Sequence, residues 1–180
     1  LARRVVSFRS AEPPDKMIYI LFAACGRQTL RGFWGGDDLF SITLICMGRL
    51  KEKFYIQAAE EYKKRLGAFC DFQLVELPEV RLPEDPNAAQ IAQGLSREAE
   101  AIRAKIPKGS WLCILAPEGK GLSSEELAGK LADLKKSGKS SACFLIGSSF
   151  GVDAGLKKQA DFLLSMSRMT FPHHLARVMA

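Results

Sequence analysis

Three short segments of this sequence combine small, polar and apolar residues in a way that suits binding of a small ligand. They are residues 117–121 (PEGKG), 147–151 (GSSFG) and 165–171 (SMSRMTF), and each follows an apolar run. In the third segment, methionine and phenylalanine interleave with serine and threonine, although a surface turn is normally polar. An adenine-like ring can lie between such apolar groups while the backbone hydrogen-bonds its edge. We therefore predict that these segments enclose one ligand.

Each segment also has a purely structural interpretation. Glycines in residues 147–151 let a ligand approach backbone N–H groups closely. The segment matches neither G-x-G-x-x-G nor G-x-x-x-x-G-K-[ST], however, so a plain strand-to-helix turn explains it equally well. Residues 165–171 are alternatively a buried crossover that packs into the core. Both interpretations of each segment stay open on the residues alone.

Two histidines and two nearby arginines are candidates for substrate contacts. His173 and His174 are the only histidines. Adjacent positions on a helix point about 100° apart, which disfavours joint ligation of one ion, and we predict no metal site. Arg177 lies one turn after His173 on the same face. Arg168 and Arg177 are placed to hold RNA phosphates; the alternatives are solvated arginines and a structural histidine.

Charge and cysteine usage narrow the class of protein. The 26 Lys and Arg against 20 Asp and Glu give a net charge of +6, which favours a polyanionic partner without identifying one. The five cysteines include no C-x-x-C pair, so we predict neither a zinc site nor a disulfide framework. Cys46, Cys113 and Cys143 lie within apolar runs and are predicted to be core thiols in a reducing compartment.

Hydrophobic periodicity predicts the elements that position these residues. From residue 42 onward, apolar runs alternate with helical segments, which is typical of an α/β fold with a mostly parallel central sheet flanked by helices. We predict strands at residues 42–47, 72–77, 111–116, 142–146 and 162–164, and helices at 54–69, 88–106, 123–137, 153–160 and from 172. A proline-rich loop at 78–86 is a candidate for mobility. Ligands bind beyond the carboxyl ends of parallel strands, where the three segments should meet.

Residues 1–40 differ from the rest of the chain. A segment containing several basic residues precedes an apolar run at 17–24 and a glycine-rich stretch at 31–38. We expect an N-terminal extension outside the packed domain, which would then span residues 41–180. The alternative is an exported, lipid-anchored protein, because the sequence ending at Cys25 resembles a lipid-attachment box. The apolar run is too short to span a bilayer, so we expect no membrane partner.

Four ordered segments of the chain resemble the ribosomal RNA large-subunit methyltransferase H family of SPOUT proteins. They are residues 42–53 (ITLICMGRLKEK), 115–120 (LAPEGK), 144–151 (FLIGSSFG) and 165–178 (SMSRMTFPHHLARV). The resemblance implies a trefoil-knotted SPOUT fold and a cytoplasmic homodimer. It also implies S-adenosylmethionine-dependent methylation of N3 of a pseudouridine in 23S ribosomal RNA, within the assembled ribosome.

Individual residues can now be given expected roles. His173 and Arg177 are candidate catalytic residues that contact the substrate, because they lie next to the segment 165–171 in the sequence. The positions that match the cofactor site of the family are Leu115, Gly147, Met166, Ser167, Arg168, Met169, Thr170 and Phe171. These positions fall in or beside the three segments already singled out.

The sequence departs from the family pattern in three places. Ser148 stands where the family usually has glycine, and Ala116 where an aspartate is common, so we expect weaker cofactor binding. The chain also ends at Ala180, and we expect it to lack the last part of the family's final helix and its C-terminal tail. The alternative function is therefore a catalytically inactive remnant that binds cofactor or RNA.

Overall fold

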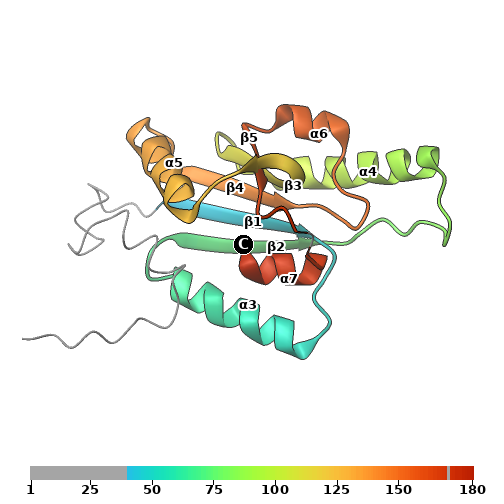
Figure 1. Ribbon diagram of the computed structural model, residues 1–180, viewed down its shortest axis with the longest axis horizontal. Helices are drawn as coiled ribbons and strands as arrows, with labels where there is room; N and C mark the ends of the chain where they lie inside the picture. Colours follow the sequence, from blue (N-terminus) through green and yellow to red (C-terminus); the bar gives the residue numbers. More distant parts are fainter. Residues whose placement is uncertain (1–39, 170) are drawn as a thin grey trace, which may run out of the picture.

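Five parallel strands form one sheet in the computed structural model, which describes residues 40–169 and 171–180 (Figure 1). In chain order the elements are β1 (Ser41–Met47), α3 (Lys53–Leu66), β2 (Asp71–Leu77), α4 (Ala88–Arg103), β3 (Trp111–Gly121), α5 (Ser124–Lys136), β4 (Ser141–Ile146), α6 (Ala154–Gln159), β5 (Phe162–Ser165) and α7 (His173–Met179). The strand order in the sheet is β2-β1-β4-β3-β5. The predicted α/β fold with a parallel sheet flanked by helices is confirmed.

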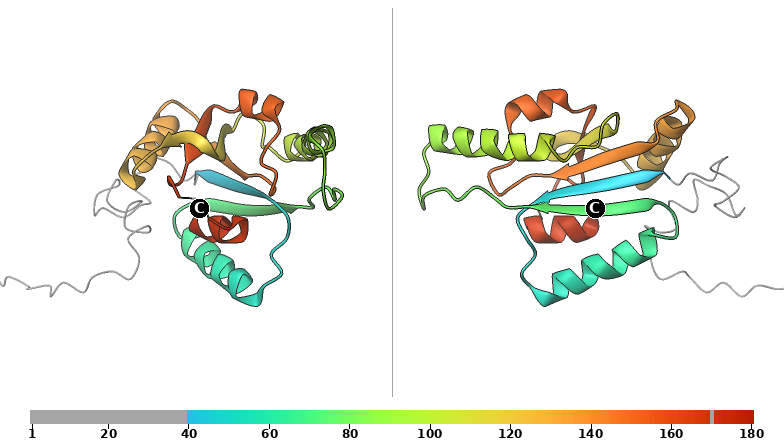
Figure 2. Two further views of the ribbon diagram at one scale, coloured as in Figure 1. Left: turned by 45° about the vertical axis from the view of Figure 1, so that its right-hand side comes forward. Right: turned by 180° about the vertical axis from the view of Figure 1, so that it is seen from behind.

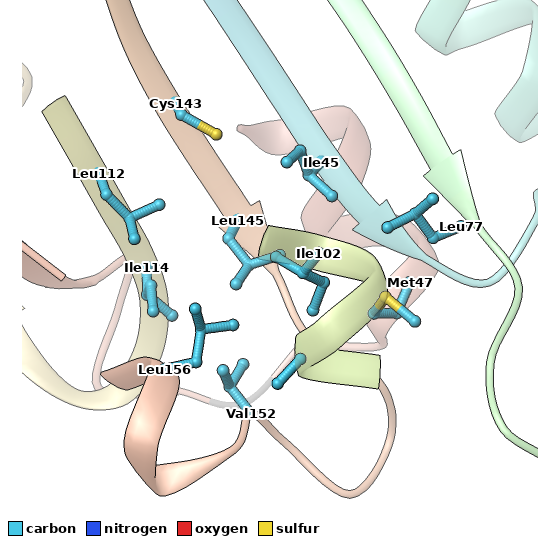
Figure 3. Close-up of a cluster of buried hydrophobic side chains, with 11 residues drawn as sticks. Ile45, Met47, Leu77, Ile102, Leu112, Ile114, Cys143, Leu145, Val152 and Leu156 are labelled. Atoms are coloured by element: carbon cyan, nitrogen blue, oxygen red, sulfur yellow. The ribbon is translucent and has the colours of Figure 1, made fainter. Parts of the chain in front are cut away.

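Helices cover both faces of the sheet. α4 and α6 lie on one face, and α3 and α7 lie on the other (Figures 1 and 2). Beneath α4 and α6, a buried cluster joins alternate side chains of the strands to the two helices (Figure 3); it consists of Ile45, Met47, Leu77, Ala99, Ile102, Leu112, Ile114, Cys143, Leu145, Val152 and Leu156. Leu131 of α5 packs against Trp111 and Cys113, whose side chains alternate with those of Leu112 and Ile114. α5 therefore covers the face opposite to α4 and α6.

The packed domain begins one residue earlier than predicted. Phe40 is only 3% exposed and belongs to the same buried cluster as Trp111, and its carbonyl accepts a hydrogen bond from the backbone N–H of Asp71. The extension predicted for residues 1–40 is therefore wrong for Phe40. The other predictions for residues 1–39, including lipid attachment at Cys25, lie outside the described residues.

The segment 117–121, predicted to be a loop, is instead the second half of β3. The strand runs to Gly121, and Leu115 and Lys120 both lie opposite Leu164 of β5, so the residues between them form an irregularity in the ladder. An ideal Cβ on Gly119 would lie 2.7 Å from backbone atoms of Leu163 and Leu164. Glycine thus permits β3 to approach β5 this closely, which the proline and glycine content alone does not reveal.

The predicted helices form, with some differences at their ends. The helix predicted for 54–69 ends at Leu66 and has no buried residue, and Phe54 is 62% exposed. The helix predicted for 88–106 ends at Arg103. The predicted capping box at Ser123 and Glu126 is confirmed. Within the described ranges, no helix has the length and apolar character needed to cross a bilayer.

Candidate active site

A cleft of about 190 Å³ lies beside the irregularity in the middle of β3 and at the carboxyl ends of β4 and β5. It is lined by Leu115, Ala116, Pro117, Ile146, Leu164, Ser165, Met166, Ser167, Arg168, Met169, Phe171 and Ala176. A second cavity of about 280 Å³ shares Leu115, Leu164, Ser165 and Met166 with the cleft. The structure therefore brings six of the eight predicted cofactor residues to one cleft. Gly147 follows the lining residue Ile146 without lining the cleft, and Thr170 lies outside the described residues.

Serine side chains hold the methionine-containing loop of the cleft in place. The Ser165 hydroxyl donates to the carbonyl of Ser167 at 3.0 Å, and the backbone N–H of Met169 donates to the Ser167 hydroxyl at 2.9 Å. Met166 is partly buried, whereas Met169 is 73% exposed and Arg168 is also exposed. The loop thus lines the cleft with a partly buried methionine and an exposed arginine.

The glycine loop after β4 closes on itself. The backbone N–H of Ser148 donates to the Gly151 carbonyl at 3.1 Å, and the N–H of Gly151 donates to the Ser148 carbonyl at 2.9 Å. An ideal Cβ on Gly147 would lie 2.4 Å from the Gly151 oxygen and 2.5 Å from a methyl carbon of Val152. The loop itself therefore fills the space into which a Gly147 side chain would extend, which gives this glycine a structural reason that needs no ligand. The predicted contact between Gly147 and the cofactor stays a prediction.

Arg177 is a buried structural residue in this protein. Its side chain is 0% exposed and forms an ion pair with Glu76 of β2. It also donates hydrogen bonds to the carbonyl oxygens of Met47 at 2.8 Å and Gly48 at 3.0 Å. The guanidinium therefore joins α7 to the carboxyl ends of β1 and β2. This burial contradicts the prediction that Arg177 reaches RNA phosphates.

The histidines lie beside the cleft, and neither lines it. His173 Nε2 is 3.5 Å from Glu79 Oε1, and its side chain is 20% exposed. His174 Nδ1 is 3.4 Å from Glu52 Oε2. Within the described residues we find no group of three or more side chains suited to hold a metal ion.

Burial gives His173 a measurable effect on acid stability. Its pKa is lowered mainly by burial, with smaller contributions from Arg177 and His174, while Glu79 opposes the change. The unfolded chain then binds the proton more tightly than the folded chain does. The stability that neutral His173 contributes is therefore fully present above the ordinary histidine pKa of about 6.5, and it is lost as the pH falls below that value. We expect the free energy of unfolding to fall less between pH 7.5 and 5.5 in His173→Gln than in the wild type. Equal decreases in urea titrations would contradict this assignment.

The buried thiols are not candidates for nucleophilic chemistry. Burial raises the pKa of Cys46, Cys113 and Cys143 to about 12, so all three stay protonated at neutral pH. Each is 0% exposed, which confirms their predicted place in the core.

Two acidic residues beside the cleft, Glu76 and Glu98, were not predicted from the sequence. Glu76 accepts from the backbone N–H of Leu50 at 3.2 Å and pairs with Arg177. Glu98 is 5% exposed and accepts hydrogen bonds from two loops. Each stands where the local period places an apolar side chain, Glu76 two residues after Leu74 and Glu98 four residues before Ile102. A charge on an apolar face was the signal that could have identified them.

Comparisons with known proteins agree with this architecture. A family model described as "Predicted SPOUT methyltransferase" matches residues 40–180. Three similar proteins are each named Ribosomal RNA large subunit methyltransferase H. The one from Clostridioides difficile (strain 630) is 40% identical over 138 residues, covering 77% of this chain and 87% of that protein. The one from Moorella thermoacetica is 41% identical over 140 residues, covering 78% and 88%. The one from Bifidobacterium adolescentis is 44% identical over 137 residues, covering 76% and 86%.

The match covers the whole described domain and nearly the full length of these relatives, and the parallel sheet is the α/β architecture expected of it. The chain therefore belongs to the SPOUT methyltransferase family, and within it to the family of ribosomal RNA large subunit methyltransferase H.

Proposed function

We propose that this chain uses S-adenosylmethionine to methylate N3 of a pseudouridine in 23S ribosomal RNA of the assembled ribosome. The observation that carries the proposal is the cleft between the middle of β3 and the carboxyl ends of β4 and β5, where apolar residues and the methionine-containing loop line one space. Membership of the family supports methyl transfer, and the names of the relatives support ribosomal RNA as the substrate. A cytoplasmic homodimer with a trefoil-knotted chain belongs to the same proposal.

The residues that line the cleft and the adjoining cavity are suited to bind this cofactor. Leu115, Met166 and Phe171 supply apolar surface for an adenine ring, and the loop backbone supplies polar groups for its edge. The cleft alone, at about 190 Å³, is smaller than a typical ligand pocket. The adjoining cavity of about 280 Å³ shares part of its wall and provides room for the rest of an elongated ligand. We include Thr170 in the site, and Gly147 as the residue that shapes the neighbouring loop.

Methyl transfer from S-adenosylmethionine requires no dedicated acid–base pair from the protein. Bound S-adenosylmethionine supplies a methyl group that its sulfonium has already activated. The protein residues must align the acceptor nitrogen with that group, exclude water and favour loss of the imide proton. Leu115 and Met166 exclude water from the cleft wall, and the hydrogen bonds of Ser165 and Ser167 fix the loop that carries Met166. Alignment therefore provides much of the expected rate.

Arg168 is the cation best placed to meet RNA at this cleft. It lines the cleft and is exposed, in contrast to the buried Arg177. An exposed guanidinium can hold a phosphate oxygen pair with two parallel hydrogen bonds. His173, at 20% exposure, remains a second candidate for contact on the substrate side.

Calorimetry with S-adenosylmethionine, followed by transfer of its tritiated methyl group to bacterial ribosomes, tests the proposal. We expect the protein to bind S-adenosylmethionine and to label 23S ribosomal RNA. RNA in which the pseudouridine is replaced by uridine should not be labelled. Arg168→Ala should lower labelling by about tenfold, and should lower it more than it lowers cofactor affinity, because phosphate contacts position the substrate. Binding without labelling would indicate the inactive remnant, and absence of binding would overturn the cofactor assignment.

A further inference from the structure

We propose that Glu98 of α4 is a positioning residue that holds two loops in register at the edge of the cofactor cleft. This inference rests on the proposed function, because the loops matter through the cofactor that the cleft would bind. Glu98 itself does not line the cleft.

The Glu98 carboxylate is buried and uses both of its oxygens. Its side chain belongs to a residue only 5% exposed. Oε1 accepts from the backbone N–H of Val80 at 2.9 Å, and Oε2 accepts from the Ser148 hydroxyl at 2.8 Å. A carboxylate removed from water is costly unless hydrogen bonds compensate it. The two bonds therefore identify a specific junction at this point of the fold.

The two partners of Glu98 belong to different loops at the carboxyl end of the sheet. Val80 lies in the proline-rich loop after β2, next to Glu79, which approaches His173. Ser148 lies in the glycine loop after β4, two residues beyond Ile146 of the cleft wall. One carboxylate thus connects α4 to both loops. Ser148, which stands where the family usually has glycine, anchors the glycine loop to α4, and the weaker cofactor binding expected from this departure stays a prediction.

The chemistry of the junction separates two substitutions at position 98. Val80 presents a backbone donor, whereas the Ser148 hydroxyl can donate or accept. Glutamine can accept from Val80 through its oxygen and donate to Ser148 through its amide, so Glu98→Gln keeps both connections. Glu98→Ala leaves a partly buried N–H and a partly buried hydroxyl without their partner and frees the glycine loop from α4. Recovery by glutamine would show that the hydrogen bonds, not the charge, do the positioning.

A matched control exists at the opposite end of the sheet. The Asp161 carboxylate accepts from the backbone N–H of Leu112 at 2.7 Å, near the amino ends of β3 and β5. Asp161→Ala removes a carboxylate-to-backbone hydrogen bond far along the strands from the cleft. It should lower stability without changing the loops that Glu98 holds.

Two measurements on the full chain test the proposal. Calorimetry with S-adenosylmethionine, well below the melting temperature, should show affinity reduced about tenfold or more in Glu98→Ala, since small misplacements of a site have large effects. Glu98→Gln and Asp161→Ala should stay within about threefold of the wild type. Without cofactor, amide exchange in residues 79–82 and 147–151 should accelerate in Glu98→Ala and not in Asp161→Ala.

The outcomes are separable from those of the proposed function. Failure of the wild type to bind would refute the cofactor assignment, while the exchange experiment would still decide the role of Glu98. Unchanged exchange in Glu98→Ala, or equal effects of Glu98→Ala and Asp161→Ala on affinity, would overturn the inference. If Glu98→Ala does not fold, Ser148→Ala removes one of the two bonds and should speed exchange in residues 147–151 alone.

Discussion

Replacing Arg177 with alanine should lower the free energy of unfolding by about 3 kcal/mol, as judged by urea denaturation. The substitution leaves the carbonyl oxygens of Met47 and Gly48 and the carboxylate of Glu76 without their cationic donor. Removing one partner of a buried ion pair usually has an effect of about 3–5 kcal/mol. Glu76 retains 32% of its side-chain exposure and can regain water, so the lower end of that range applies.

Arg168→Ala is the matched control for this prediction. Arg168 is an exposed arginine nine residues earlier in the chain, and its removal should change stability by less than about 0.5 kcal/mol. Methylation and cofactor affinity should both fall in Arg177→Ala, because the ends of β1 and β2 lose their connection to α7. If Arg177→Ala keeps wild-type stability and loses only methylation, the result would contradict the structural role. It would support the substrate contact that the sequence predicted for Arg177.

The elements that the sequence predicted best are those whose environment is uniform along their length. β1 and β4 are central strands covered on both faces, so continuous apolar runs marked them to within one residue. The start of α5 was equally clear, because Ser123 and Glu126 form a capping box whose bonds are local. Local hydrogen bonds and burial on both faces can therefore be predicted from residues that are adjacent in the sequence.

Features that depend on distant partners were not predicted. Residues 117–121 have the composition of a loop, and only pairing of Lys120 and Gly121 with β5 makes them part of β3. Arg177 was expected at the surface, since nothing near it in sequence shows that Glu76 lies beside it across 101 positions. Glu98 and Ser148 are separated by 50 positions. Polar contacts of this kind are fixed by topology, which residue patterns describe only in part.

The location of the candidate site was predictable even though several roles were not. Parallel strands place their carboxyl ends at one edge, and that rule alone brought Leu115 and the methionine-containing loop together. The same edge also carries the structural contacts of Arg177 and Glu98. Residues that bind and residues that support the loops are therefore mixed along this edge, and sequence proximity to the ligand loops does not distinguish them.

Gly147→Ala should be among the most damaging substitutions in this chain, lowering cofactor affinity by about a hundredfold and stability by about 1–3 kcal/mol. The added methyl group would lie 2.4 Å from the Gly151 oxygen and 2.9 Å from its carbonyl carbon. Backbone atoms cannot move aside as a flexible side chain can, so the turn between Ser148 and Gly151 must open. Calorimetry and thermal unfolding of the ligand-free variant measure the two effects.

The ligand-free measurement decides why this position is glycine. A clash within the loop destabilises the protein before any ligand binds, whereas a clash with ligand alone would leave the melting temperature unchanged. Gly129 of α5 provides the comparison, because an ideal Cβ there meets nothing within 4 Å. Gly129→Ala should stabilise the helix by about 0.5–1 kcal/mol with unchanged affinity. If Gly147→Ala loses cofactor binding but keeps wild-type stability, the loop clash is contradicted. The space beside this glycine would then be occupied by the ligand.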